Sequence, residues 1–190
     1  MGLTNKGVGI GLPAPDFELK ATNGKSYSLS AFRGKPTILF FMRKKLGFNS
    51  RSQLEQLKSL HEIISSIAQL IVILEDDGEA EGMGTPQKYI DSSALPCPVL
   101  LDPYGKVLNR YNIYKLVGLD GYQMARPSLF LIGYEQEIVY NYVGEKPLDY
   151  PNYEMLMAQL QNIVVANSSR SNHFVPIIAT PMSHTIYAVA

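Results

Sequence analysis

Apolar residues in the first 165 positions follow two alternating patterns, short continuous runs and longer stretches with helical spacing. Residues 37–42 and 70–74 are apolar at consecutive positions, which is typical of central strands covered on both faces. Between them, from residue 50 to about 69, apolar positions recur three or four residues apart and predict a helix. Together these segments predict a β-α-β unit, whose crossover should be right-handed.

The same hydrophobic patterns predict further strands and helices before and after this unit. Strand-like residues 17–20 and 27–29 flank Asn23-Gly24, a common turn sequence, and predict a hairpin near the N-terminus. Later strands are expected at 98–101, 128–132 and 138–143, the last two as an antiparallel hairpin, and helices at 85–91, 107–111 and 153–165. This alternation of strands and helices predicts an α/β protein with a central mixed sheet flanked by helices.

The composition changes after residue 165. Residues 167–172 are polar, and residues 174–190 are apolar, contain Pro176 and Pro181, and show no clear period. We therefore expect one domain at residues 11–165, preceded by an N-terminal arm at 1–10. We expect residues 166–190 to form a polar linker and a tail that is either disordered or docked as an added strand.

Charge and composition restrict the classes of function. Seventeen basic and seventeen acidic residues cancel to a formal net charge of +0, so bulk charge favours neither nucleic acid nor an anionic membrane. No apolar stretch approaches the roughly 20 residues that span a bilayer. Residues 1–11 lack the apolar core of a signal peptide, and we expect a cytoplasmic protein. The single cysteine, Cys97, excludes an intramolecular disulfide and a cysteine-cluster metal site, and we expect no cofactor.

Four local sequences, in this order along the chain, resemble the peroxiredoxins of the alkyl hydroperoxide reductase and thiol-specific antioxidant branch of the thioredoxin superfamily. The first, Gly-Leu-Pro-Ala-Pro-Asp-Phe at 11–17, looks like the opening of that family. The others are residues 28–36, which lead into the central strand, residues 95–107 with Asp-Pro-Tyr-Gly, and residues 126–132. The resemblance covers roughly residues 11–165 and implies a thioredoxin-like fold.

The resemblance fails at the position of the catalytic thiol. In the family, a cysteine attacks the peroxide as a thiolate, becomes a sulfenic acid and is reduced by a second thiol. Alignment with the family places that cysteine at Gly47, and the second member of a Cys-x-x-Cys pair at Ser50. Glycine carries no nucleophile. A serine hydroxyl is protonated at neutral pH and has no oxidation state that corresponds to a sulfenic acid.

Several residues around the degenerate site still match the family or suggest a ligand. Arg126 is the candidate for the arginine that polarises peroxide, and Pro127 follows it, in a cis or a trans bond that the sequence leaves open. A helix that starts near Ser50 would offer free N–H groups to an anion. The expected ligand-binding residues are Arg43, Phe48, Ser50, Arg51 and Arg126. Ser50 is also expected to cap this helix by accepting a hydrogen bond from the Gln53 N–H.

The cysteine and the histidines offer little alternative chemistry. Cys97 lies at the amino end of a predicted strand, whereas ligands and catalytic groups in parallel sheets gather at carboxyl ends, so we expect a small buried side chain. His61 is expected on the surface of the long helix. His173 and His184 lie in the tail, and the sequence indicates no metal site.

Three kinds of function therefore remain open. The first is a non-catalytic redoxin-fold protein that binds a small molecule or a protein partner at the former active-site face. The second is a thiol-dependent peroxide reductase that uses Cys97, or whose catalytic cysteines have been replaced. The third is an enzyme that uses the same region without a thiol. The resemblance also allows a homodimer, because thioredoxin-type proteins often pair through sheet edges or helix faces.

Overall fold

The structure is a computed structural model that describes residues 7–42, 48–76, 95–117, 122–145, 149 and 151–171. The helix expected at 85–91 and the tail beyond residue 171 lie outside the described residues. No described helix is long and apolar enough to cross a membrane.

The core of the fold is a seven-stranded mixed sheet with the strand order β2-β1-β5-β4-β3-β8-β9. Strands β3, β4 and β5 are parallel to one another, and the other pairs are antiparallel. The strand bounds are β1 Glu18–Ala21, β2 Ser26–Ser28, β3 Thr37–Met42, β4 Gln69–Asp76, β5 Val99–Pro103, β8 Ser128–Ile132 and β9 Ile138–Val143. This arrangement confirms the predicted N-terminal hairpin, the β-α-β unit, the later hairpin and the mixed sheet.

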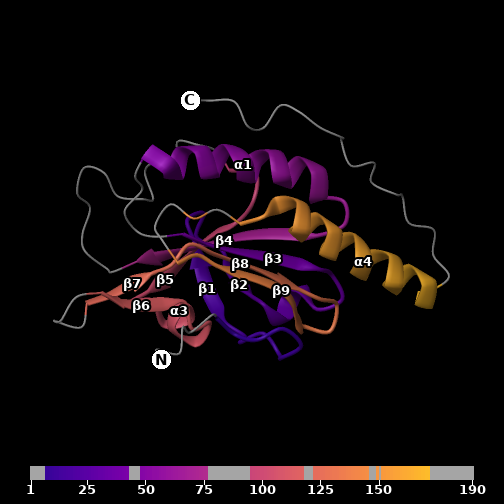
Figure 1. Ribbon diagram of the computed structural model, residues 1–190, viewed down its shortest axis with the longest axis horizontal. Coiled ribbons are helices and arrows are strands. Elements are labelled where there is room, and N and C mark those ends of the chain that lie inside the picture. The colour runs from indigo at the N-terminus through magenta and orange to yellow at the C-terminus, as the bar shows by residue number, and fades with distance from the viewer. Residues whose placement is uncertain are drawn as a thin grey trace.

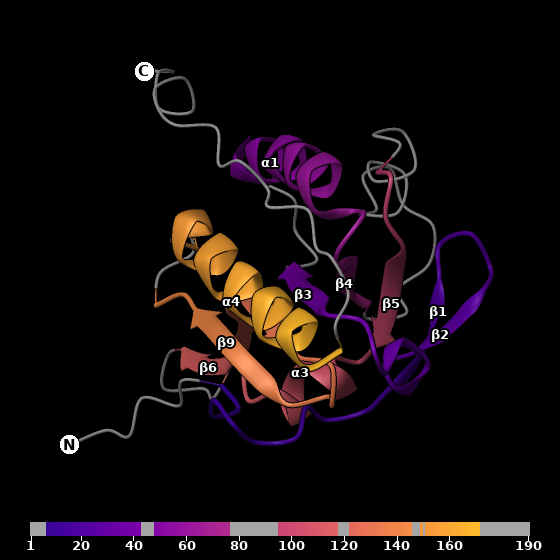
Figure 2. The same cartoon turned by 90° about the vertical axis from the view of Figure 1, so that its right-hand side faces the viewer.

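Helices cover the two faces of the sheet unequally. Helices α1 (Phe48–Ile64) and α4 (Tyr153–Ser171) lie on one face, and the short helix α3 (Lys106–Arg110) lies on the other, as Figures 1 and 2 show. The 3-10 turn η1 (Ser30–Phe32) follows β2. Side chains alternate along a strand, so Phe40 packs beneath the two long helices and Phe41 lies on the face of α3. Because both faces are covered, every residue of β3 is buried.

Helix α1 is shorter than the periodicity predicts. It ends at Ile64 instead of near residue 69, and the N–H groups of Ile67 and Ala68 both donate to the Ile64 carbonyl at 2.9 and 2.8 Å. The chain has to reverse here, because β4 begins at Gln69. Ile67 and Ala68 keep the apolar pattern because they pack against the core from the turn and not from the helix.

Helix α4 is longer than predicted, and it ends at Ser171 instead of at residue 165. The hydroxyls of Ser168 and Ser169 donate to the carbonyls of Val164 and Val165, four residues earlier, at 2.7 and 3.0 Å. Serine side chains can satisfy helical carbonyls in this way. The first part of the predicted polar linker is therefore helical, which corrects that expectation.

A second, two-stranded sheet was not foreseen from the sequence. Strands β6 (Tyr114–Val117) and β7 (Tyr122–Ala125) pair antiparallel, with Tyr114 opposite Ala125. The β6–β7 hairpin lies at one end of the main sheet, on the side of α3 (Figure 1). Each strand has only four residues and mixes polar with apolar positions, so neither stands out as a strand by pattern.

Candidate functional site

The candidate site lies where the parallel strands end. Strand β3 ends at Met42 and α1 begins at Phe48, so the loop that the family resemblance singles out joins them at this edge. Met42 is level with Leu74 of β4 and Leu101 of β5. In open α/β sheets, ligands bind beyond the carboxyl ends of the strands.

The structure places only part of the predicted ligand set. Arg43 and Gly47 lie outside the described residues. Phe48, Ser50 and Arg51 belong to the first turns of α1, of which the structure describes the backbone only. Because α1 begins at Phe48, Ser50 lies inside the helix, and the prediction that it forms the N-cap is wrong.

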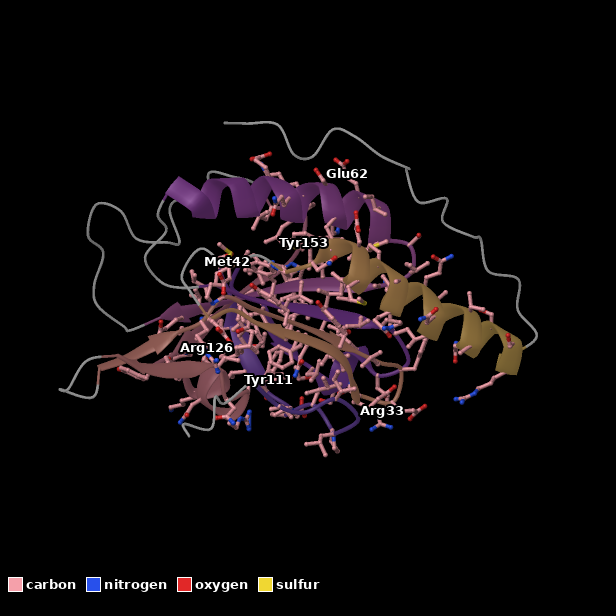
Figure 3. The ribbon with its side chains drawn as sticks, in the orientation of Figure 1. Arg33, Met42, Glu62, Tyr111, Arg126 and Tyr153 are labelled. Atoms are coloured by element: carbon pink, nitrogen blue, oxygen red, sulfur yellow. The ribbon has the colours of Figure 1, made fainter. Side chains whose placement is uncertain are left out.

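Arg126 lies beside the end of β3. Phe41 of β3 pairs with Ser128 of β8, so Arg126, two residues earlier, lies just past the last residues of β3. Figure 3 shows Met42 and Arg126 toward the same end of the sheet, with Arg33 at the opposite end. The tertiary structure therefore brings Arg126 to the edge at which β3 leads toward α1.

The Arg126 guanidinium bonds to the segment before β6. Its Nε donates to the Ile113 carbonyl at 3.4 Å and an Nη donates to the Asn112 carbonyl at 3.3 Å, while its backbone N–H donates to Ile113 at 2.9 Å. The residue is only 7% exposed. Burial lowers the pKa of Arg126, and the nearby Glu145 carboxylate acts in the opposite direction. Ile113 belongs to the core on the face opposite α1, so Arg126 contacts that side of the sheet edge.

Pro127 directly precedes β8 and bonds to the residue that follows β9. The described residues contain no cis peptide bond, so the Arg126–Pro127 bond is trans. The Pro127 carbonyl accepts the Gly144 N–H at 2.9 Å, and the Ser128 hydroxyl donates to the Arg126 carbonyl at 2.9 Å. The first bond continues the β8–β9 pairing past the strand ends, and the second is a local bond that holds the Arg126 carbonyl.

Cys97 lies far from this edge. It lies in a bend two residues before β5 and four residues before Leu101, which is level with Met42, so up to about 13 Å of chain separates the two levels. Its side chain is 7% exposed and packs in the core under α1. Burial raises the pKa of the Cys97 thiol to about 12. At neutral pH this cysteine is a protonated core residue.

A pair of carboxyl groups at the same edge was missed from the sequence. Glu75 at the end of β4 and Asp102 of β5 are register neighbours, and the Tyr114 hydroxyl donates to Glu75 Oε1 at 2.6 Å. Asp102 is fully buried and accepts the N–H groups of Val107 and Leu108 at 2.8 to 3.0 Å. Its pKa is raised, first by burial and further by Glu75, while the backbone N–H groups lower it.

Part of this group could have been found in the sequence. The sequence Asp-Pro-Tyr-Gly at 102–105 indicates a turn, and an aspartate at the start of a turn can accept hydrogen bonds from backbone N–H groups that follow it. The contact between Tyr114 and Glu75 joins residues 39 positions apart, and no local pattern indicates it.

The histidines contribute nothing to this edge in the part of the chain that the structure describes. His61 lies in the last turn of α1, on a partly exposed position. His173 and His184 lie beyond the described residues. Within the described ranges, no three His, Cys, Asp or Glu side chains come together as metal ligands.

Comparison with known proteins places the chain among redoxins. A family model described as "AhpC/TSA family" matches residues 10–141. Peroxiredoxin Bcp of Bacillus subtilis (strain 168) is 27% identical over 146 residues, which make up 75% of this chain and 90% of that protein.

Solved structures agree in fold. The crystal structure of peroxidoxin BcpB from Mycobacterium tuberculosis superposes with a TM-score of 0.64 at 20% identity, covering 81% of this chain and 97% of that one. A bacterioferritin comigratory protein of Xanthomonas campestris, described for its alkyl peroxide reduction activity, superposes with a TM-score of 0.61 at 16% identity, covering 79% and 91%. At these identities the similarity shows a thioredoxin-like fold.

Proposed function

The chain belongs to the AhpC/TSA family, and from that membership we propose that it is a peroxiredoxin-like protein without thiol peroxidase activity. In this proposal it binds a small ligand or a protein partner at the end of the sheet where β3 stops. A cytoplasmic location, expected from the sequence, is part of the proposal. The observation that carries it is the position of Cys97, the one cysteine in the chain.

The chemistry of peroxide reduction needs a thiolate at the reacting position. With the pKa of Cys97 raised to about 12, roughly one molecule in 100,000 would carry the thiolate at pH 7. The thiol is also buried in the core, at the amino end of β5, so a peroxide would have to enter the core beneath α1 to reach it. Neither the charge state nor the position suits a peroxidatic cysteine.

The edge itself still suits a ligand in this proposal. Arg126 is fixed there by backbone carbonyls, and α1 begins at Phe48, five residues after Arg43 in the sequence. Basic side chains beside a helix N-terminus favour negatively charged groups, because the free N–H groups and the helix dipole act in the same direction. We therefore assign Arg43, Phe48, Ser50, Arg51 and Arg126 to the ligand contact surface, and we expect the ligand to be anionic.

A peroxide assay tests the loss of activity. The wild-type protein and Cys97→Ser are incubated with hydrogen peroxide and dithiothreitol, and peroxide loss is followed against a blank without protein. We expect both proteins to match the blank. Turnover above the blank that disappears in Cys97→Ser would instead support a thiol peroxidase that uses Cys97.

Cysteine insertion provides the positive control for the same assay. Gly47→Cys and Ser50→Cys place a thiol where the family resemblance expects one. If α1 still activates a thiol, its pKa should fall below that of an exposed cysteine in an unfolded chain. Acidification is measured by the pH dependence of alkylation in a Cys97→Ser background, so that only the inserted thiol reacts.

Anion binding at this edge is tested separately with inorganic phosphate. Thermal unfolding is followed with and without phosphate in wild type, Arg51→Gln and Arg33→Gln. Arg33 is an exposed arginine that pairs with Glu135 at 3.1 Å at the opposite end of the sheet, and it serves as the matched control. We expect phosphate to raise the Tm of wild type and Arg33→Gln but not of Arg51→Gln. Equal shifts in all three proteins would contradict an anion site at α1.

A further inference from the structure

Among the described residues, the β6–β7 hairpin makes no strand pair with the main sheet, although β7 leads into β8 through residues 126–127. Its two strands pair with each other and form a separate sheet among the described residues. An isolated two-stranded hairpin is marginally stable in water, so its position depends on contacts with the body of the protein. The segment that enters the hairpin, Asn112 and Ile113, supplies the two carbonyls to which the Arg126 guanidinium donates.

We propose that Tyr114 and Glu75 form a latch that holds this hairpin and thereby positions Arg126 at the end of the sheet. Tyr114 is the first residue of β6 and follows Ile113 directly. Its hydroxyl donates to the Glu75 carboxylate at 2.6 Å, a short distance typical of a charge-assisted hydrogen bond. The bond ties the base of the hairpin to the carboxyl end of β4, next to Asp102 of β5.

Two further features fit a latch at this place. Gly105 has no side chain, and a Cβ added there would overlap the Tyr114 hydroxyl, so the turn after β5 leaves room for the tyrosine ring end. Gly105 also has a φ of +62°, in the left-handed region that glycine adopts without strain. Glu75 is also the register neighbour of the buried Asp102, whose carboxyl accepts the first N–H groups of α3, so the Tyr114 hydroxyl is bonded at the point where β4, β5 and the start of α3 meet.

The consequence concerns Arg126. Its Nε and Nη donate to carbonyls of the two residues that precede the latch, so releasing Tyr114 should loosen the acceptors that orient the guanidinium. Tyr114 and Glu75 are thus positioning residues, which act on Arg126 through the backbone of residues 112–113. Their importance for a ligand rests on the proposed function, but the latch itself can be tested without ligand or peroxide.

Hydrogen exchange of the Arg126 Nε–H, followed by NMR, is the specific readout. We expect Tyr114→Phe to speed this exchange about tenfold, which corresponds to losing one hydrogen bond to a charged group. Amide exchange in the β3–β4 ladder should stay unchanged. Glu75→Gln keeps an oxygen acceptor, so it should give a smaller acceleration. Tyr104→Phe removes a hydroxyl from a side chain on a residue that is 74% exposed, and it is the matched control with no expected effect.

Two results would overturn the latch. An exchange rate of Arg126 within about twofold of wild type in Tyr114→Phe would show that the guanidinium is positioned without it. Equal acceleration in the β3–β4 ladder would show a general loss of stability instead of a local release. Should Tyr114→Phe fail to fold, the smaller change expected for Glu75→Gln decides between the same outcomes. Failure here leaves the peroxide and phosphate tests of the proposed function unaffected.

Discussion

Alkylation of Cys97 should be far slower in the folded protein than in the unfolded chain. Burial raises the pKa of this thiol from the ordinary 9.0 to about 12. Since alkylating agents react with the thiolate, this rise in pKa lowers the reactive fraction about 1,000-fold at any pH below 9. The side chain is only 7% exposed, so restricted access would slow the reaction further. The expected slowing is therefore at least about 1,000-fold.

The assay compares iodoacetamide labelling at pH 8 in buffer and in a urea concentration that unfolds the chain. Because Cys97 is the only cysteine, mass spectrometry of the intact protein reports its modification directly. Rates in the two conditions that agree within about tenfold would refute the reasoning, because that would require an accessible thiol with a nearly ordinary pKa. A rapid reaction in buffer would also support the alternative function, a thiol-dependent peroxide reductase that uses Cys97.

The same pKa shift predicts how stability depends on pH. A thiol with a raised pKa in the folded state favours folding while it is protonated, so its contribution is complete below pH 9 and is lost as the pH rises from 9.0 toward 12. The expected slope in this window is about 1.4 kcal/mol per pH unit. Urea unfolding at several pH values should show this decline in wild type, and a weaker decline in Cys97→Ala. Parallel curves for the two proteins would contradict the shift.

Three other substitutions probe the core and its polar groups, each measured as the free energy of unfolding in urea. Tyr111→Phe should stabilise the protein by about 1 kcal/mol, because the buried hydroxyl has no hydrogen-bond partner among the described residues; destabilisation would contradict this. Asp102→Ala should cost about 2 kcal/mol, because it leaves two N–H groups at the start of α3 without their buried acceptor, and a neutral effect would contradict that role. Leu57→Ala, in the core under α1, should cost about 3 kcal/mol, whereas Ile63→Ala on the partly exposed side of the same helix should cost much less; similar losses would contradict the assigned burial.

The sequence predicted the main elements well where burial repeats along the chain. Residues 37–42 are buried at every position, so their continuous apolar run identified β3 correctly. The same logic failed where packing continues beyond an element. Ala68 lies in a turn but is buried, and its apolar character made the predicted helix too long. The serines near the end of α4 are helical, although their polarity suggested a linker.

The site could be predicted only in outline. The carboxyl end of β3 was identified from the family resemblance, and the trans state of the bond before Pro127 came from the structure. The role of Arg126 in binding the carbonyls of residues 112 and 113 had no signal in the sequence, because the contact depends on a hairpin whose short strands carry no clear pattern.

The order of strands and helices and the presence of one cysteine were determined by the sequence itself, because they are encoded in local periodicity and composition. The family resemblance came from four local sequences in their order along the chain. The protonation and remoteness of Cys97, the contact of Tyr114 with Glu75 and the surroundings of Arg126 were decided only by tertiary structure. The physical reason is that burial and hydrogen bonding between distant segments follow from strand order. In this sheet, strand order places β8 beside β3, although α1, β4, β5, α3 and the β6–β7 hairpin lie between them along the chain.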